Sequence, residues 1–169
     1  MNTDWLKDAE EICTRCGGRC CDFAQPPISR SCYERLVAAG ISPDSFEYRG
    51  YRRLQVKNNG ECVLSKDGKC SIHSIKPETC RAGPFTFDLK GDMIEIYLKF
   101  ESLCPIVRLL KEEPEAYARQ YEVAVHNIAR LVQNLTDDEL ATICRIEEPE
   151  TELVALIPRY GHGSHDDRH

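Results

Sequence analysis

Apolar residues recur at helical spacing in two stretches, residues 4–12 and 114–135. Side chains three or four positions apart lie on the same face of a helix, so each stretch predicts an amphipathic helix. Residues 29–39 predict another helix, because a serine stands at its start and a glycine follows its end. The capping-box pattern of residues 136–139 predicts a further short helix that reaches residue 145.

Alternating apolar and polar residues predict the strands. Residues 84–100 alternate on both sides of a Lys-Gly-Asp turn, which is the pattern of a β-hairpin. Residues 62–72 predict a smaller hairpin around a Lys-Asp-Gly turn, with one cysteine on each arm. A proline then predicts a single helical turn that presents Cys80. Two more short strands are predicted at residues 51–57 and 152–157.

Composition limits where the protein works. The chain has 169 residues, of which 41% are hydrophobic and 30% are charged, so a packed core is expected. The net charge of -6 argues against nucleic-acid binding, which normally needs a basic face. No apolar run approaches the roughly 20 residues that span a bilayer. Residues 1–11 are acidic and do not resemble a signal peptide, so we expect a cytoplasmic protein with no membrane partner.

Eight of the ten cysteines fall into two groups. The first group is Cys13, Cys16, Cys20 and Cys21. The second group is Cys62, Cys70, Cys80 and Cys104. In an oxidising compartment such cysteines would form disulfides, whereas in the reducing cytoplasm they serve more often as metal ligands or redox thiols. The eight residues are therefore the predicted metal ligands.

Eight thiolates are enough for two four-sulfur sites. A [4Fe–4S] cluster needs four thiolates, and so does a Cys₄ zinc site. The spacing of Cys13 and Cys16 allows both to chelate one metal through a tight turn, although redox-active pairs share this spacing. Cys20 and Cys21 are adjacent and tend to diverge, so they would serve two metals or leave one thiol free. The spacing leaves the metal open between an iron–sulfur cluster and zinc.

Four other residues also need an interpretation. Cys32 and Cys144 are expected to be buried apolar residues, with a ligand role for Cys32 as the alternative. His73 is either a ligand in a mixed Cys/His site or a side chain beside the site. Arg81 directly follows a predicted ligand, so we expect it to offset thiolate charge next to the metal. The alternative is that Arg81 binds an anionic substrate.

Together these patterns predict an α+β fold. We expect a small irregular, cysteine-rich metal-binding domain with short β-hairpins, followed by a long C-terminal helix. A single domain is predicted over residues 1–160, with the cysteine-cluster core at 13–105 and the helical part at 106–146. The polar residues 161–169 are predicted to be a flexible tail.

The cysteines also stand in a recognisable sequence context. The motif consists of Cys-x2-Cys-x3-Cys-Cys from residue 13, then Cys62-Val63-Leu64, residues 68–81, Pro84-Phe85 and Cys104-Pro105. Its most specific part is the segment Cys70–Arg81, in which a proline stands three residues before the last cysteine and an arginine directly after it. This motif resembles the YkgJ-type cysteine-cluster family, also described as zinc- or iron-chelating domains.

The resemblance covers residues 13–105, with some departures. The first cysteine group is one residue longer than the usual form, His73 and Lys76 replace a tyrosine and an arginine, and Ile106 replaces a glycine. None of these changes removes a thiol. The resemblance implies metal binding, and relatives linked to protein lysine methylation machinery with an iron–sulfur cluster favour that cluster over zinc.

Three functions follow from these observations. The first is a cytosolic protein that binds an iron–sulfur cluster, zinc or both, and that transfers electrons. The second is a metal-dependent enzyme that acts on a peptide or protein. The third is a structural zinc module that binds a partner protein through the helix over residues 114–135. No paired carboxylates, Ser/His/Asp order or phosphate loop supports the enzyme.

Overall fold

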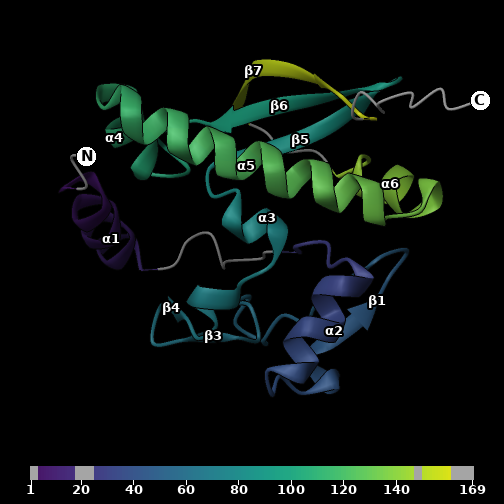
Figure 1. Cartoon of the computed structure of the whole chain (residues 1–169). Helices are drawn as coiled ribbons and strands as arrows, with labels where there is room; N and C mark the ends of the chain where they lie inside the picture. The colour runs from purple at the N-terminus through teal and green to yellow at the C-terminus, as the bar shows by residue number, and fades with distance from the viewer. Residues whose placement is uncertain (1–3, 18–24, 147–149, 161–169) are drawn as a thin grey trace, which may run out of the picture.

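The computed structural model describes residues 4–17, 25–146 and 150–160. In this part of the chain, helices surround small antiparallel sheets (Figure 1). The predicted α+β class is confirmed, and so is the long helix near the C-terminus. No helix of the described residues is long and apolar enough to cross a membrane.

The helices are α1 (Asp4–Cys16), α2 (Arg30–Ala38), α3 (Glu78–Arg81), α4 (Ile106–Glu112), α5 (Pro114–Asn134) and α6 (Asp137–Ile143). Short 3-10 turns are η2 (Pro43–Ser45) and η3 (His73–Ile75). Strands β1 (Phe46–Tyr48) and β2 (Arg52–Leu54) pair with each other, and so do β3 (Ser65–Lys66) and β4 (Lys69–Cys70). Strands β5 (Phe85–Lys90), β6 (Met93–Lys99) and β7 (Thr151–Pro158) form a sheet in that order.

The predicted helix caps are present. The Ser29 hydroxyl accepts a hydrogen bond from the backbone N–H of Cys32 at the start of α2, at 3.2 Å. Thr136 and Glu139 form the predicted capping box of α6. Each cap satisfies backbone N–H groups that have no partner inside the helix. Helix α4 was not predicted, because seven residues between prolines are too few for helical periodicity to stand out.

The larger core lies between α5 and the sheet. Alternate residues of β6, namely Ile94, Ile96 and Leu98, are almost fully buried and belong to one cluster with apolar residues of α5 such as Ile128 and Leu131. Burial of each such side chain contributes about 1.5–3 kcal/mol. Figure 1 shows α5 running along this sheet. Strand β7 was predicted, but its pairing with β6 was not.

A second, smaller core lies under α2. It consists of Ile28, Cys32, Leu36, Phe46, Leu54, Cys62 and Ile72. Helix α3 lies between this part and α5 in Figure 1, and it packs directly against α5. The side-chain amide of Gln120 on α5 donates hydrogen bonds to the backbone carbonyls of Arg81 and Ala82, at 3.0 and 3.1 Å. These bonds hold the end of α3 in place.

The small hairpin is shorter than predicted. Strands β3 and β4 are only two residues each, and their turn contains Asp67 and Gly68, both with positive φ. Cys70 is on β4, but Cys62 lies before β3 and pairs with Val56 in an isolated bridge. The chain reverses after Cys62, since the N–H of Ser65 donates to the Cys62 carbonyl at 2.9 Å. The prediction of one cysteine on each arm is therefore wrong for Cys62.

Candidate metal centre

The first two predicted ligands lie in the last turns of a helix. Cys13 is exposed and Cys16 is half-buried, and a spacing of three residues places both on one face of α1. We expected a tight loop around this pair. Helix α1 instead continues beyond residue 12 and stops at Gly17, whose φ is +71°. The pair is therefore presented by a helix end rather than by a loop.

The end of α1 meets the turn of the β3–β4 hairpin. A Cβ atom added to Gly68 would lie 3.2 Å from the carbonyl oxygen of Gly17. Gly17 directly follows Cys16, and Gly68 stands two residues before Cys70. Segments that belong to the two cysteine groups are therefore in contact, although they are far apart in the sequence.

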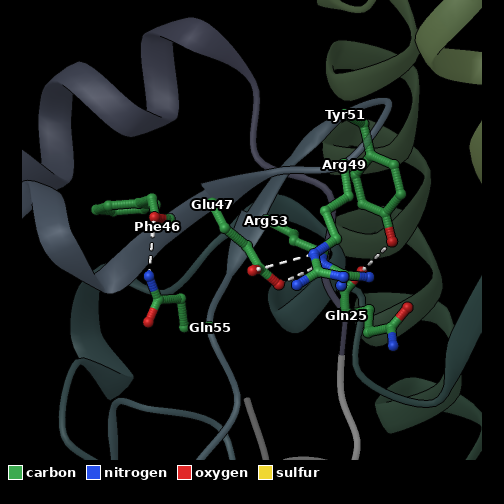
Figure 2. A network of polar contacts seen from close by, with 7 residues as sticks. All are labelled: Gln25, Phe46, Glu47, Arg49, Tyr51, Arg53 and Gln55. Carbon is green, nitrogen blue, oxygen red and sulfur yellow. Dashed lines mark hydrogen bonds and ion pairs between the residues drawn. The ribbon is translucent and has the colours of Figure 1, made fainter.

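Cys20 and Cys21, the other predicted ligands of the first group, lie outside the described residues. Residues 25–28 are held against β2 and the residue before it. The N–H of Ile28 donates to the carbonyl of Arg52 at 2.8 Å. The hydroxyl of the buried Tyr51 donates to the carbonyl of Gln25 at 3.2 Å (Figure 2). Tyr51 was not singled out from the sequence, because an isolated tyrosine in a predicted strand carries no signal of this contact.

Figure 2 also shows how the β1–β2 hairpin is held together. The Glu47 carboxylate accepts hydrogen bonds from Arg53 at 2.8 Å and from Arg49 at 3.3 Å. Arg53 lowers the pKa of the Glu47 carboxyl group through this hydrogen bond. The side-chain amide of Gln55 donates to the carbonyl of Phe46 at 3.3 Å. The hairpin is thus a braced support for residues 25–28.

The pKa of the Cys62 thiol is raised above its usual value, although its surroundings act on it in both directions. Burial raises the pKa of its thiol, and the nearby Cys70 raises it too. The backbone N–H groups of Leu64 and Ser65 donate to the Cys62 sulfur and lower the pKa. Amide donors aimed at sulfur stabilise negative charge there, and tight metal-binding loops share this feature. The Cys-Val-Leu sequence alone gave no sign of these donors.

The remaining predicted ligands lie at the edges of the larger core. Cys80 is half-buried on α3, which confirms that a proline-led helical turn presents it. Cys104 is half-buried next to α4 and packs against the core, as does Trp5 of α1. Helix α1 packs against α4, so the helix that carries Cys13 and Cys16 also contacts the larger core.

Arg81 braces the loop that precedes Cys80. Its Nε donates to the carbonyl of Lys76 at 3.0 Å, and Nη2 lies 3.4 Å from the carbonyl of Ser74. These contacts fix η3 against α3. His73, in the same turn, is exposed. The suggested roles of Arg81 and His73 beside a metal stay predictions.

Cys32 and Cys144 lie apart from the two groups in sequence. Cys32 is buried as predicted, and burial, with the Glu78 charge as a second cause, raises the pKa of its thiol to about 11. Cys144 is half-buried at the end of α6, where burial and Asp88 raise the pKa of its thiol to about 11. Both thiols are therefore protonated near neutral pH.

The donor chemistry fits zinc or iron, since both metals bind thiolates. Among residues 4–17, 25–146 and 150–160, no three Cys, His, Asp or Glu side chains are grouped closely enough to hold a metal ion. Cys20 and Cys21, two of the eight predicted ligands, lie outside these residues.

These features describe a metal-binding cysteine-cluster protein. Residues 12–105 match the model of the CxxCxxCC family, described as a "Putative zinc- or iron-chelating domain", and the chain belongs to this family. The match confirms the resemblance to a cysteine-cluster family, and its limits contain both cysteine groups. No curated protein and no solved structure matches the chain.

Proposed function

We propose that the protein binds a [4Fe–4S] cluster through thiolates of both cysteine groups and works in the cytoplasm. Zinc bound by the same thiolates is the alternative. The observation that carries the proposal is the contact between Gly17 and Gly68, which joins the end of α1 to the hairpin that bears Cys70. A shared centre needs such a contact, because its ligands come from distant parts of the chain.

The proposed ligands are Cys13, Cys16, Cys20, Cys21, Cys62, Cys70, Cys80 and Cys104. Bound iron–sulfur clusters exchange single electrons. The chain contributes N–H donors to the Cys62 sulfur, partial burial of most thiols, and Arg81 near Cys80. Hydrogen bonds to sulfur and exposure to solvent are the features by which proteins tune cluster potentials. Electron transfer is thus the activity we propose.

Partner binding through α5 receives no support. Several apolar residues of this helix, including Ala124, Ile128 and Leu131, are fully buried in the protein's own core, whereas Val123 is exposed. An amphipathic helix needs an accessible apolar face to dock on a partner. Helix α5 therefore serves to cover the sheet.

The test is anaerobic purification of the full chain, followed by elemental analysis and a visible absorption spectrum. Bound iron and sulfide in equal amounts, with a broad visible band that bleaches on reduction, would support the cluster. Stoichiometric zinc without iron would contradict the iron–sulfur proposal and support the zinc alternative. A chain without either metal would contradict the proposal.

Ligand assignments are tested by replacing single cysteines. Cys16→Ser and Cys80→Ser remove one proposed ligand from each group, so both variants should lose bound metal. Cys144→Ser is the matched control, because Cys144 is equally half-buried but belongs to neither group. Full metal retention in either of the first two variants would remove that residue from the ligand set.

A further inference from the structure

A small polar cavity lies between α2, α3 and α5, outside the proposed metal ligands. Its volume is about 30 Å³, larger than the roughly 10–15 Å³ that one water needs. The polar side chains around it are Ser31, Arg35, Glu78, Arg81, Asn127 and Arg130. Each of the three helices contributes one arginine, so the lining comes from segments far apart in the sequence.

The charge of this lining is positive. The lining contains three arginines, Arg35, Arg81 and Arg130, and one carboxylate, that of Glu78. No ion pair of the described residues joins Glu78 to any of these arginines. Like charges around a small cavity repel one another, and an anion bound between them would relieve the repulsion. Planar guanidinium groups suit oxoanions, because they donate parallel hydrogen bonds.

Glu78 sets a second requirement for a ligand of this cavity, namely a hydrogen-bond donor. The residue is only 4% exposed, and its Oε1 accepts a hydrogen bond from the Ser29 hydroxyl at 2.8 Å. Its Oε2 is buried and has no hydrogen-bond partner among the described residues. A buried acceptor without a partner is costly, so a matching ligand must offer a donor as well as negative charge.

We propose that this cavity binds hydrogen phosphate. The arginines would donate to its charged oxygens, Arg81 through Nη1 because its Nε and Nη2 donate to the carbonyls of Lys76 and Ser74. The remaining O–H of the phosphate would donate to Oε2 of Glu78. Sulfate carries no proton at neutral pH and would place an oxygen against the carboxylate. A phosphomonoester loses its last proton near a pH of about 6, so at neutral pH it also lacks the donor. The site therefore prefers free inorganic phosphate to sulfate and to phosphomonoesters.

The first experiment is calorimetric titration of the full chain, with its metal, at neutral pH in a chloride buffer. Phosphate should bind at least about tenfold more tightly than sulfate or phenyl phosphate, because only phosphate supplies the donor. Equal affinity for phosphate and sulfate, or for phosphate and phenyl phosphate, would overturn the proposal. So would the absence of phosphate binding.

Glu78→Gln tests the acceptor directly. Its side-chain amide can donate a hydrogen bond, so phosphate should bind about tenfold more weakly and sulfate more tightly than in the wild type. A variant that keeps the preference for phosphate over sulfate would contradict the role of Glu78. Because Glu78 lies two residues from Cys80, metal content and thermal melting are measured on the same sample.

Arg130→Gln keeps the proposal testable even where Glu78→Gln does not fold. Arg130 is at the exposed surface of α5, so the variant should fold and bind phosphate about tenfold more weakly. Arg108→Gln is the control, because it makes the same charge change at an exposed arginine on α4, outside the cavity. An equal loss in both variants would mean general charge attraction and would overturn the site.

Discussion

Gly68 is the residue at which the two cysteine groups meet. Its φ of +72° is unfavourable for any residue with a Cβ atom, and that atom would lie 3.2 Å from the Gly17 carbonyl oxygen. Gly68→Ala should therefore lower the free energy of unfolding by about 1–3 kcal/mol. It should also weaken metal binding, because the end of α1 has to move away. Thermal melting and metal content measure the two effects.

Gly91 supplies the matched control for this prediction. Its φ is +59°, close to that of Gly68, but a Cβ atom there would meet nothing within 4 Å. Gly91→Ala should have the backbone penalty alone, about 1–2 kcal/mol, and keep its metal. Equal metal loss in the two variants would mean that the contact with Gly17 has no part in the centre.

Cys32 makes stability depend on alkaline pH. The pKa of its thiol is about 11 in the folded protein, raised from 9.0 mainly by burial. A raised pKa means that the unfolded chain releases the proton first, so this contribution is complete below pH 9 and is lost as pH rises toward about 11. The free energy of unfolding of the wild type, measured with denaturant, should fall more steeply over this window than that of the Cys32→Ala variant. Parallel pH profiles would show that the Cys32 thiol is not the cause.

At the scale of elements, the sequence predicted the helices and turns whose ends are set by capping residues, prolines and glycines. Capping residues identified α2 and α6, and the proline before α3 identified the turn that presents Cys80. The predicted end of α1 was too early, because Cys13 and Cys16 were assigned to a loop. The actual stop is Gly17, and α1 gains support from α4, an element that the sequence pattern did not reveal.

The contacts that build the candidate sites could not be predicted in this way. The pairing of Gly17 with Gly68, and the bonds from Gln120 to the end of α3, join residues that no local pattern connects. The same holds for the arginines of the polar cavity, which come from three separate helices. Cysteine spacing predicted the chemical class of one site. The arrangement of both sites depends on tertiary packing.

The β1–β2 hairpin gives a prediction at this scale. Tyr51 donates a hydrogen bond to the carbonyl of Gln25, just after the segment with Cys20 and Cys21. Tyr51→Phe keeps the buried ring but removes this bond, which should cost about 1 kcal/mol and speed metal release to a chelator. Tyr48→Phe on the neighbouring strand is the control, since Tyr48 is 64% exposed. Identical release rates in both variants would exclude Tyr51 as an anchor of the metal centre.

At the scale of the whole molecule, the described residues contain two hydrophobic cores of unequal strength. The larger core combines a three-stranded sheet with α5. The smaller core supports hairpins with strands of only two or three residues, which are marginally stable without further support. Among the proposed ligands, Cys62 and Cys70 are part of the smaller core, whereas Cys80 and Cys104 lie at the edge of the larger one. Metal binding should therefore contribute most of the stability of that part.

Removal of the metal by a chelator tests this division. Amide hydrogen exchange should become much faster in residues 25–75. Strands β5 and β6 and helix α5 should keep their protection, because only Cys80 and Cys104 among the proposed ligands adjoin their core, and both lie at its edge. Re-addition of metal should restore the slow exchange. Simultaneous loss of protection in both parts would show that α3, which packs on α5 and carries Cys80, couples the two cores into one cooperative unit. Unchanged exchange everywhere would mean that metal adds nothing to the fold.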